Sequence, residues 1–231
     1  MSTKSRKEQI EELSVELKKK YNITKMKGMT MELPDSKAEY GDINILQITL
    51  KNKNGLPLIM IPGYSYRSFQ DMAKMLMTGY NHLNTKYSYI YMICWTDEIK
   101  EITSSTNDYD KQDEYKSIFA NILNKILRRL EITKCSVVGK SAGGGVSIYL
   151  TSVNPDVQYL YLACPGITRR AKPLAGRQIP IKLMWARDDD VLTYSMYKEF
   201  LSDFDDQKQE YSFHSYNTGG HELNTQFIYE L

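Results

Sequence analysis

One serine stands between two glycines in residues 139–143, which read Gly-Lys-Ser-Ala-Gly and follow the apolar run 135–138. A serine that attacks a carbonyl carbon projects from a sharp turn between a strand and a helix. The residues two positions before and after it lie too close to neighbouring backbone for a side chain. Gly139 and Gly143 meet that requirement, so the pattern indicates a nucleophile at Ser141. It is not a phosphate-binding loop, because the first glycine of that motif would fall on Lys134.

An acidic turn and a late histidine follow this serine in the chain. The apolar strand expected at Ile181–Ala186 leads into three consecutive aspartates, Asp188, Asp189 and Asp190. His221 lies in a glycine-containing loop near the end of the sequence. With the order serine, acid, histidine, the chain resembles the α/β-hydrolase family from about residue 29 to the C-terminus.

The resemblance implies a catalytic triad of Ser141, Asp189 and His221. In this interpretation Ser141 attacks an acyl carbonyl, His221 takes and returns the proton, and Asp189 orients the imidazole and stabilises its charged form. Asp189 is the acid when the family's small-x-x-Asp turn is counted from Ala186. Asp188 replaces it if the turn differs by one residue. This chemistry requires no metal and no organic cofactor.

A backbone site for the developing negative charge is expected before the serine. The short apolar strand Leu56–Ile61 ends in Pro62-Gly63-Tyr64-Ser65, where family members usually carry His-Gly. Pro62 takes the place of that histidine. Because the oxyanion hole is built from backbone N–H groups, here those of Tyr64 and Ala142, the exchange is compatible with catalysis.

The function implied is that of a serine hydrolase that cleaves an ester or thioester through an acyl-enzyme, such as a carboxylesterase, thioesterase or small lipase. A serine nucleophile argues against the dehalogenase and epoxide-hydrolase branches, which use an aspartate. Three consecutive aspartates are also typical of a solvated turn or a weak cation site. The alternative function is that of a non-catalytic binding or interaction protein with the same fold.

Lys140 departs from the usual composition of such a turn. The residue before an elbow serine points into the structure or toward the rim of the site, so we expect a partly buried amine with a carbonyl or carboxylate partner. Close to His221, its charge would lower the pKa of the histidine. A serine–lysine dyad is disfavoured, because adjacent residues in this turn project in different directions.

The composition is that of a single soluble globular domain spanning residues 1–231, with 42% apolar and 25% charged residues. A net charge of +2, from 30 basic and 28 acidic residues, argues against nucleic acid or a membrane surface as a partner. The absence of a long apolar run predicts no membrane insertion and a cytoplasmic location. Cys94, Cys135 and Cys164 lie in or beside apolar strands and are expected to be buried free thiols.

Strands and helices alternate along most of the chain, which predicts an α/β-hydrolase fold with a mostly parallel central sheet and helices on both faces. The exceptions are two antiparallel strands, at 29–33 and 43–51. His82 is expected in a polar connection and His214 in an edge strand. Residues 1–22 form an amphipathic helix with a capping box at Ser5 and Glu8, packed on the body or, alternatively, contacting a second copy in a homodimer.

A short lid, residues 167–179, takes the place of the cap domain that many family members insert, so we expect an open site. The lid carries four basic residues and no acidic one. They form a solvated loop or, in the alternative, bind an anionic acyl substrate through Arg169, Arg170 and Arg177, because charge of one sign beside a cleft concentrates ligands of the opposite sign.

Overall fold

The structure is a computed structural model that describes residues 4–21, 23, 25–31, 43–95, 109–166, 174, 177–206 and 208–231. In these ranges no helix combines the length and the apolar character needed to cross a membrane. Most of the expected lid and the connection 96–108 lie outside the described residues.

Helices and strands alternate from β3 onward as the sequence predicts, except between β6 and β7, where the described residues contain no α-helix. The strands are β1 (Met26–Met31), β2 (Ile43–Thr49), β3 (Leu56–Ile61), β4 (Tyr87–Cys94), β5 (Cys135–Lys140), β6 (Val157–Ala163), β7 (Ile181–Ala186) and β8 (Tyr211–Tyr216). The helices are α1 (Arg6–Tyr21), α3 (Tyr66–Thr78), α4 (Tyr80–Lys86), α6 (Tyr109–Arg129), α7 (Ala142–Val153), α8 (Met196–Asp206) and α9 (Thr225–Ile228).

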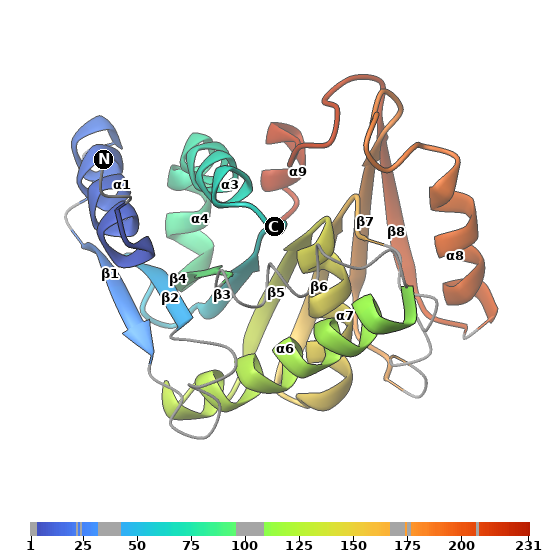
Figure 1. Cartoon of the computed structure of the whole chain (residues 1–231), viewed down its shortest axis with the longest axis horizontal. Coiled ribbons are helices and arrows are strands. Elements are labelled where there is room, and N and C mark those ends of the chain that lie inside the picture. Colours follow the sequence, from blue (N-terminus) through green and yellow to red (C-terminus); the bar gives the residue numbers. More distant parts are fainter. Residues whose placement is uncertain are drawn as a thin grey trace.

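The eight described strands form one sheet in the order β1-β2-β4-β3-β5-β6-β7-β8 (Figure 1). Among them β2 runs antiparallel to its two neighbours, β1 and β4, and the remaining pairs are parallel. The prediction of a mostly parallel sheet is therefore confirmed. His214 lies in β8, which is an edge strand as expected.

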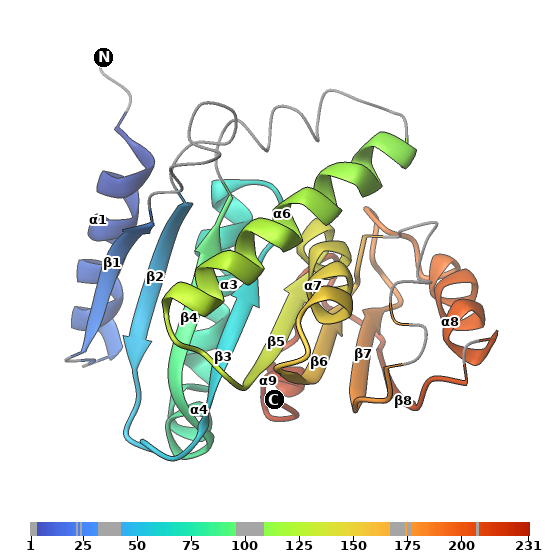
Figure 2. The same cartoon turned by 90° about the horizontal axis from the view of Figure 1, so that it is seen from below.

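Helices cover both faces of the sheet. On one face α1, α3, α4 and α9 enclose a core cluster, and on the other α6, α7 and α8 enclose a second one. Figure 2 shows α6 and α7 lying across that second face. The central strands are apolar over nearly their whole length because each is covered on both sides.

The first helix follows the predicted capping box. The Glu8 carboxylate accepts hydrogen bonds from the Ser5 backbone N–H and hydroxyl, and the Glu8 N–H donates to Ser5 Oγ. The apolar stripe of the helix, Ile10, Leu13 and Leu17, is buried in the chain's own core. Of the two interpretations, the structure thus describes the helix packed on the body.

Two local expectations are corrected. The first strand begins at Met26 rather than at residue 29, because residues 26–31 all pair with β2. The segment expected as a polar connection around His82 is the helix α4, whose single buried apolar residue, Leu83, gives too weak a periodicity to be recognised.

Because the central strands are parallel, the loops that follow them all lie at the same end of the sheet, the carboxyl end of these strands. Ile61 at the end of β3 pairs with Gly139 of β5, and Lys140 at the end of β5 pairs with Ala163 of β6. After β3 the chain turns to β4 on one side, and after β4 it crosses back to β5 on the other side. The carboxyl ends of β3 and β5 therefore form a topological switch point, where open α/β sheets bind their ligands.

Candidate active site

Ser141 occupies a strained turn between β5 and α7. Its backbone has φ 54° and ψ −127°, a conformation that costs a residue with a side chain about 1–3 kcal/mol. The strain is held by three backbone hydrogen bonds: Ser141 N–H donates to Ala163 O at 3.1 Å, and Ser141 O accepts from Gly144 and Gly166. The turn leaves the serine only partly buried. This is the geometry expected of a nucleophile elbow.

The two glycines of the motif are sterically required. A Cβ on Gly139 would overlap Ser147 Oγ, and one on Gly143 would overlap the carbonyl oxygens of Ile61 and Pro62. The expectation that these positions exclude side chains is confirmed. The close approach at Gly143 also brings the loop after β3 against the start of α7.

Asp189 and His221 form a hydrogen-bonded pair at the same edge of the sheet. His221 Nδ1 lies 2.9 Å from Asp189 Oδ2, and the Asp189 side chain is fully buried. The other carboxylate oxygen accepts from the N–H groups of Val191 and Leu192. Burial acts to raise the pKa of Asp189, but the hydrogen bonds from His221 and from these N–H groups outweigh it, so the pKa is lowered. Asp189 is therefore held as a carboxylate facing the imidazole.

The neighbouring aspartates have different surroundings. Asp188 accepts backbone N–H bonds from Gly219 and Gly220, at 3.2 and 2.8 Å, and so fixes the loop that carries His221. Asp190 is exposed. Of the two candidates for the acid, Asp189 is hydrogen-bonded to the His221 side chain. Asp188 is hydrogen-bonded instead to the backbone of the loop that carries His221.

Lys140 is buried and paired with the residue after His221. Its Nζ lies 2.7 Å from Glu222 Oε2, and its side chain is 3% exposed, compared with 48% for Glu222. The expectation of a buried amine with a carboxylate partner is confirmed. Because Lys140 precedes Ser141 and Glu222 follows His221, the ion pair ties the serine turn directly to the histidine loop.

Glu222→Gln is expected to lower the free energy of unfolding by about 1–2 kcal/mol, because it removes the charged partner of the buried Lys140 ammonium. The effect is smaller than for a fully buried pair, because Glu222 is half-exposed and water screens its charge. The free energy is measured by urea denaturation at neutral pH. Glu210→Gln, which changes an exposed glutamate without a described side-chain partner, serves as the control. Equal stability of the two variants would mean that the pair does not hold the loops together.

The loop after β3 lies beside the serine. A Cβ on Gly63 would lie 3.5 Å from Ser141 Cβ, so Gly63 is close to the serine turn. Tyr64 is the next residue of the same loop. Gly63 N–H donates to Ser68 Oγ, and Pro62 O accepts from the indole N–H of Trp95 at 2.7 Å. These bonds fix the loop without the histidine that Pro62 replaces. The backbone N–H of Ala142, at the first position of α7, has no acceptor among the described residues.

A third side chain lies beside the Asp189–His221 pair. Ligand atoms of Cys164, Asp189 and His221 lie within 4.8 Å of one another, the spacing of a potential metal site. Burial and the Asp189 carboxylate raise the pKa of the Cys164 thiol, which opposes the thiolate that a metal or a nucleophilic role requires. As expected from the sequence, Cys94, Cys135 and Cys164 are buried, and none of them is in a disulfide among the described residues.

The second ring nitrogen of His221 faces away from Asp189 and lacks a hydrogen-bond partner in the part of the chain that the structure describes. His221 Nε2 is buried and accepts no hydrogen bond from any described residue, Ser141 included. Catalytic hydrogen bonds are often long before substrate binds and shorten in the complex. His221 Nε2, the atom that would receive the serine proton, is thus shielded from water and makes no hydrogen bond to a described residue.

Of the three arginines assigned to an anionic substrate, the structure describes only Arg177. The guanidinium of Arg177 donates to the carbonyl oxygens of Thr151, Asn154, Pro155 and Val157, at the C-terminal end of α7. That end is about 18 Å from Ser141 along a twelve-residue helix, so Arg177 lies at the opposite edge of the sheet. Arg169 and Arg170 lie outside the described residues.

Sequence reasoning missed the roles of Glu222 and Asp188. Glu222 stands next to His221 in the sequence, and a charged residue beside each of two catalytic candidates was the available signal for an ion pair. The contact of Cys164 with the acid had no local signal, because β6 had to be placed beside β7 first.

No family model and no curated protein matches the sequence. Solved structures match the fold over nearly its whole length. A carboxylesterase, CesB (YbfK), and a putative hydrolase, both from Bacillus subtilis, share TM-scores of 0.64 at 10% and 11% identity, covering 96% and 99% of this chain and 95% and 98% of theirs. A predicted CIB-like hydrolase from Thermoplasma acidophilum has a TM-score of 0.61 at 17% identity, covering 89% of this chain and 99% of its own. With the sheet order and the serine turn already described, these likenesses show that the chain has the α/β-hydrolase fold.

Proposed function

We propose that the protein is a serine hydrolase that cleaves an ester or thioester with Ser141 as nucleophile, His221 as general base and Asp189 as the orienting acid. The observation that carries the proposal is the 2.9 Å bond between His221 Nδ1 and the buried Asp189 carboxylate, at the edge of the sheet to which β5 delivers Ser141. An ionised carboxylate on Nδ1 favours the tautomer whose Nε2 accepts a proton.

The reaction would proceed in two acyl transfers. Ser141 Oγ attacks the acyl carbon as its proton passes to His221 Nε2, and the oxyanion accepts hydrogen bonds from the N–H groups of Tyr64 and Ala142. The imidazolium then protonates the leaving alcohol or thiol. Water then attacks the acyl-enzyme as it gives a proton to His221 Nε2, and the imidazolium returns that proton to Ser141 Oγ as the acid leaves. Asp189 stabilises the imidazolium in both steps.

Serine is a better candidate for the nucleophile than the nearby thiol. Cys164 has no exposed surface, and burial raises its pKa, so it offers neither access nor thiolate. Ser141 is partly exposed at the positive end of α7, where developing negative charge is stabilised. The carboxylesterase and the two hydrolases named above support an acyl substrate by analogy of fold.

Labelling with a fluorophosphonate probe tests the proposal. The native protein is expected to form a stoichiometric adduct on Ser141, identified by mass spectrometry of the labelled peptide, because such probes trap a serine that a base activates. Ser136 and Ser147 are buried serines of the flanking strand and helix and should stay unlabelled. Absence of any adduct would support the alternative, a non-catalytic binding protein of the same fold.

A further inference from the structure

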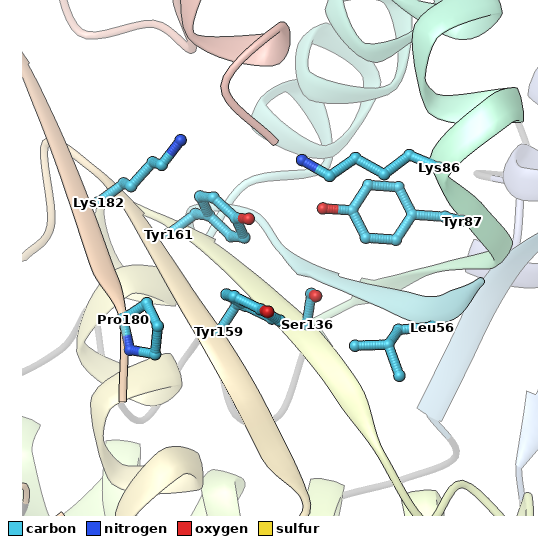
Figure 3. A pocket seen from close by; sticks show the side chains of 8 residues that line it. All are labelled: Leu56, Lys86, Tyr87, Ser136, Tyr159, Tyr161, Pro180 and Lys182. Atoms are coloured by element: carbon cyan, nitrogen blue, oxygen red, sulfur yellow. The ribbon is translucent and has the colours of Figure 1, made fainter. Parts of the chain in front are cut away.

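A cavity opens at the end of the sheet opposite Ser141. It has a volume of about 310 Å³ and lies where β3, β5, β6 and β7 begin (Figure 3). Its walls are the side chains of Leu56, Tyr87, Tyr159, Tyr161 and Pro180. Since Ser136 also lines the cavity and precedes Ser141 by five positions along β5, the two sites are about 16 Å apart.

Two lysines stand at the mouth of this cavity. Figure 3 shows Lys86, from the end of α4, and Lys182, from β7, with their amines directed toward one another from opposite sides. Burial lowers the pKa of Lys86, the positive charge of Lys182 lowers it further, and the negative charge of Glu230 opposes this in part, so the two ammonium groups repel each other across the cavity. An anion between them would relieve that repulsion.

The two lysines differ in their described partners. Lys182 donates to the Glu230 carboxylate at 2.9 Å and to the Glu230 carbonyl oxygen. Among the described residues Lys86 makes no hydrogen bond or ion pair, and its nearest described partner is the ring of Tyr87, 5.8 Å from the amine. The Lys86 ammonium is therefore the group at the mouth that is available to pair with a bound anion.

The walls favour a flat, apolar body for the ligand. The hydroxyl groups of Tyr87 and Tyr161 both donate to the main-chain oxygen of Leu231, which leaves their rings as cavity surface. The Tyr159 side chain is 42% exposed and has no hydrogen bond described. Aromatic and proline surfaces stack favourably on an aromatic ring. The volume corresponds to about ten water-sized groups, at the lower end of small-molecule sites.

We propose that this cavity is a binding site for a small aromatic monocarboxylate, with the ring among Tyr159, Tyr161 and Pro180 and the carboxylate between Lys86 and Lys182. The inference stands apart from the proposed hydrolase activity, because the cavity shares no residue with the Ser141 site. The walls offer the anion no arginine among the lining residues, so a doubly charged phosphate is matched less well than a carboxylate.

The experiment titrates the intact protein with benzoate and follows backbone amide shifts by two-dimensional NMR. Benzoate is expected to shift the amides of Tyr161 and Lys182 and to leave those of Ser141 and His221 unmoved. Lys86→Gln should weaken binding about tenfold or more, because it removes a charge-assisted contact while breaking no described ion pair. Lys198→Gln, which alters an exposed lysine on α8, should bind as the native protein does.

Three matched ligands define what would overturn the inference. Benzamide keeps the ring without the charge, acetate keeps the charge without the ring, and inorganic phosphate is an anion of another class; each should bind at least tenfold more weakly than benzoate. Equal binding of benzamide, or unchanged benzoate affinity in Lys86→Gln, would contradict a carboxylate site. Tighter binding of phosphate would contradict the aromatic class, and shifts centred on His221 would place benzoate in the other site.

Discussion

Ser141→Ala is expected to lower kcat for a short p-nitrophenyl ester by about 10³-fold or more while the protein folds normally. The hydroxyl is the group that bonds to the acyl carbon, and no other described nucleophile lies in the turn. The fold should be preserved because alanine keeps the Cβ that already tolerates φ 54° at this position. The rate is measured by release of p-nitrophenolate, and folding by thermal denaturation.

Two control variants make this result specific. Ser152→Ala changes a hydroxyl on the same helix, α7, that donates only to the Tyr149 carbonyl oxygen, and kcat should be unaffected. Cys164→Ala removes the thiol beside Asp189 and should leave kcat within about tenfold, since hydrogen bonds from His221 and backbone still hold the carboxylate. Loss of activity in Cys164→Ala with activity retained in Ser141→Ala would reverse the assignment of the nucleophile.

Asp189→Asn is the second change with a large expected effect, a decrease in kcat of about 10⁴-fold, as found when the acid of a Ser-His-Asp triad is replaced by its amide. The asparagine amide can present an N–H to Nδ1, which favours the tautomer with the proton on Nε2. His221 could then no longer accept the proton from Ser141. The decrease is measured as kcat at saturating ester, with circular dichroism to establish the fold.

The neighbouring acids give graded comparisons for that result. Asp190→Asn should keep full activity, because the side chain is exposed. Asp188→Asn should lower kcat by less than about tenfold, since asparagine retains one oxygen to accept from Gly219 or Gly220 but loses the charge. A larger decrease in Asp188→Asn than in Asp189→Asn would move the acid by one residue along the turn.

The sequence by itself determined the features that depend on local sterics and periodicity. The two glycines around Ser141 are required because neighbouring atoms fill the space of a side chain. The five-residue pattern at positions 139–143 predicts that requirement without coordinates. Buried parallel strands appear as continuous apolar runs, so β3, β4, β5 and β7 were recognisable without coordinates. The order of serine, acid and histidine then implied the fold that the structure has.

The tertiary structure decided everything that depends on register across the sheet. Glu222 pairs with Lys140, although the two residues are 82 positions apart in the sequence. Arg177 binds carbonyl groups at the end of α7 and not the site around Ser141. The different hydrogen bonds of Asp188 and Asp189 depend on which of the two carboxylates the turn directs at the imidazole of His221. A charged side chain binds the nearest unsatisfied group that packing brings to it, and that group is set by strand order rather than by sequence neighbours.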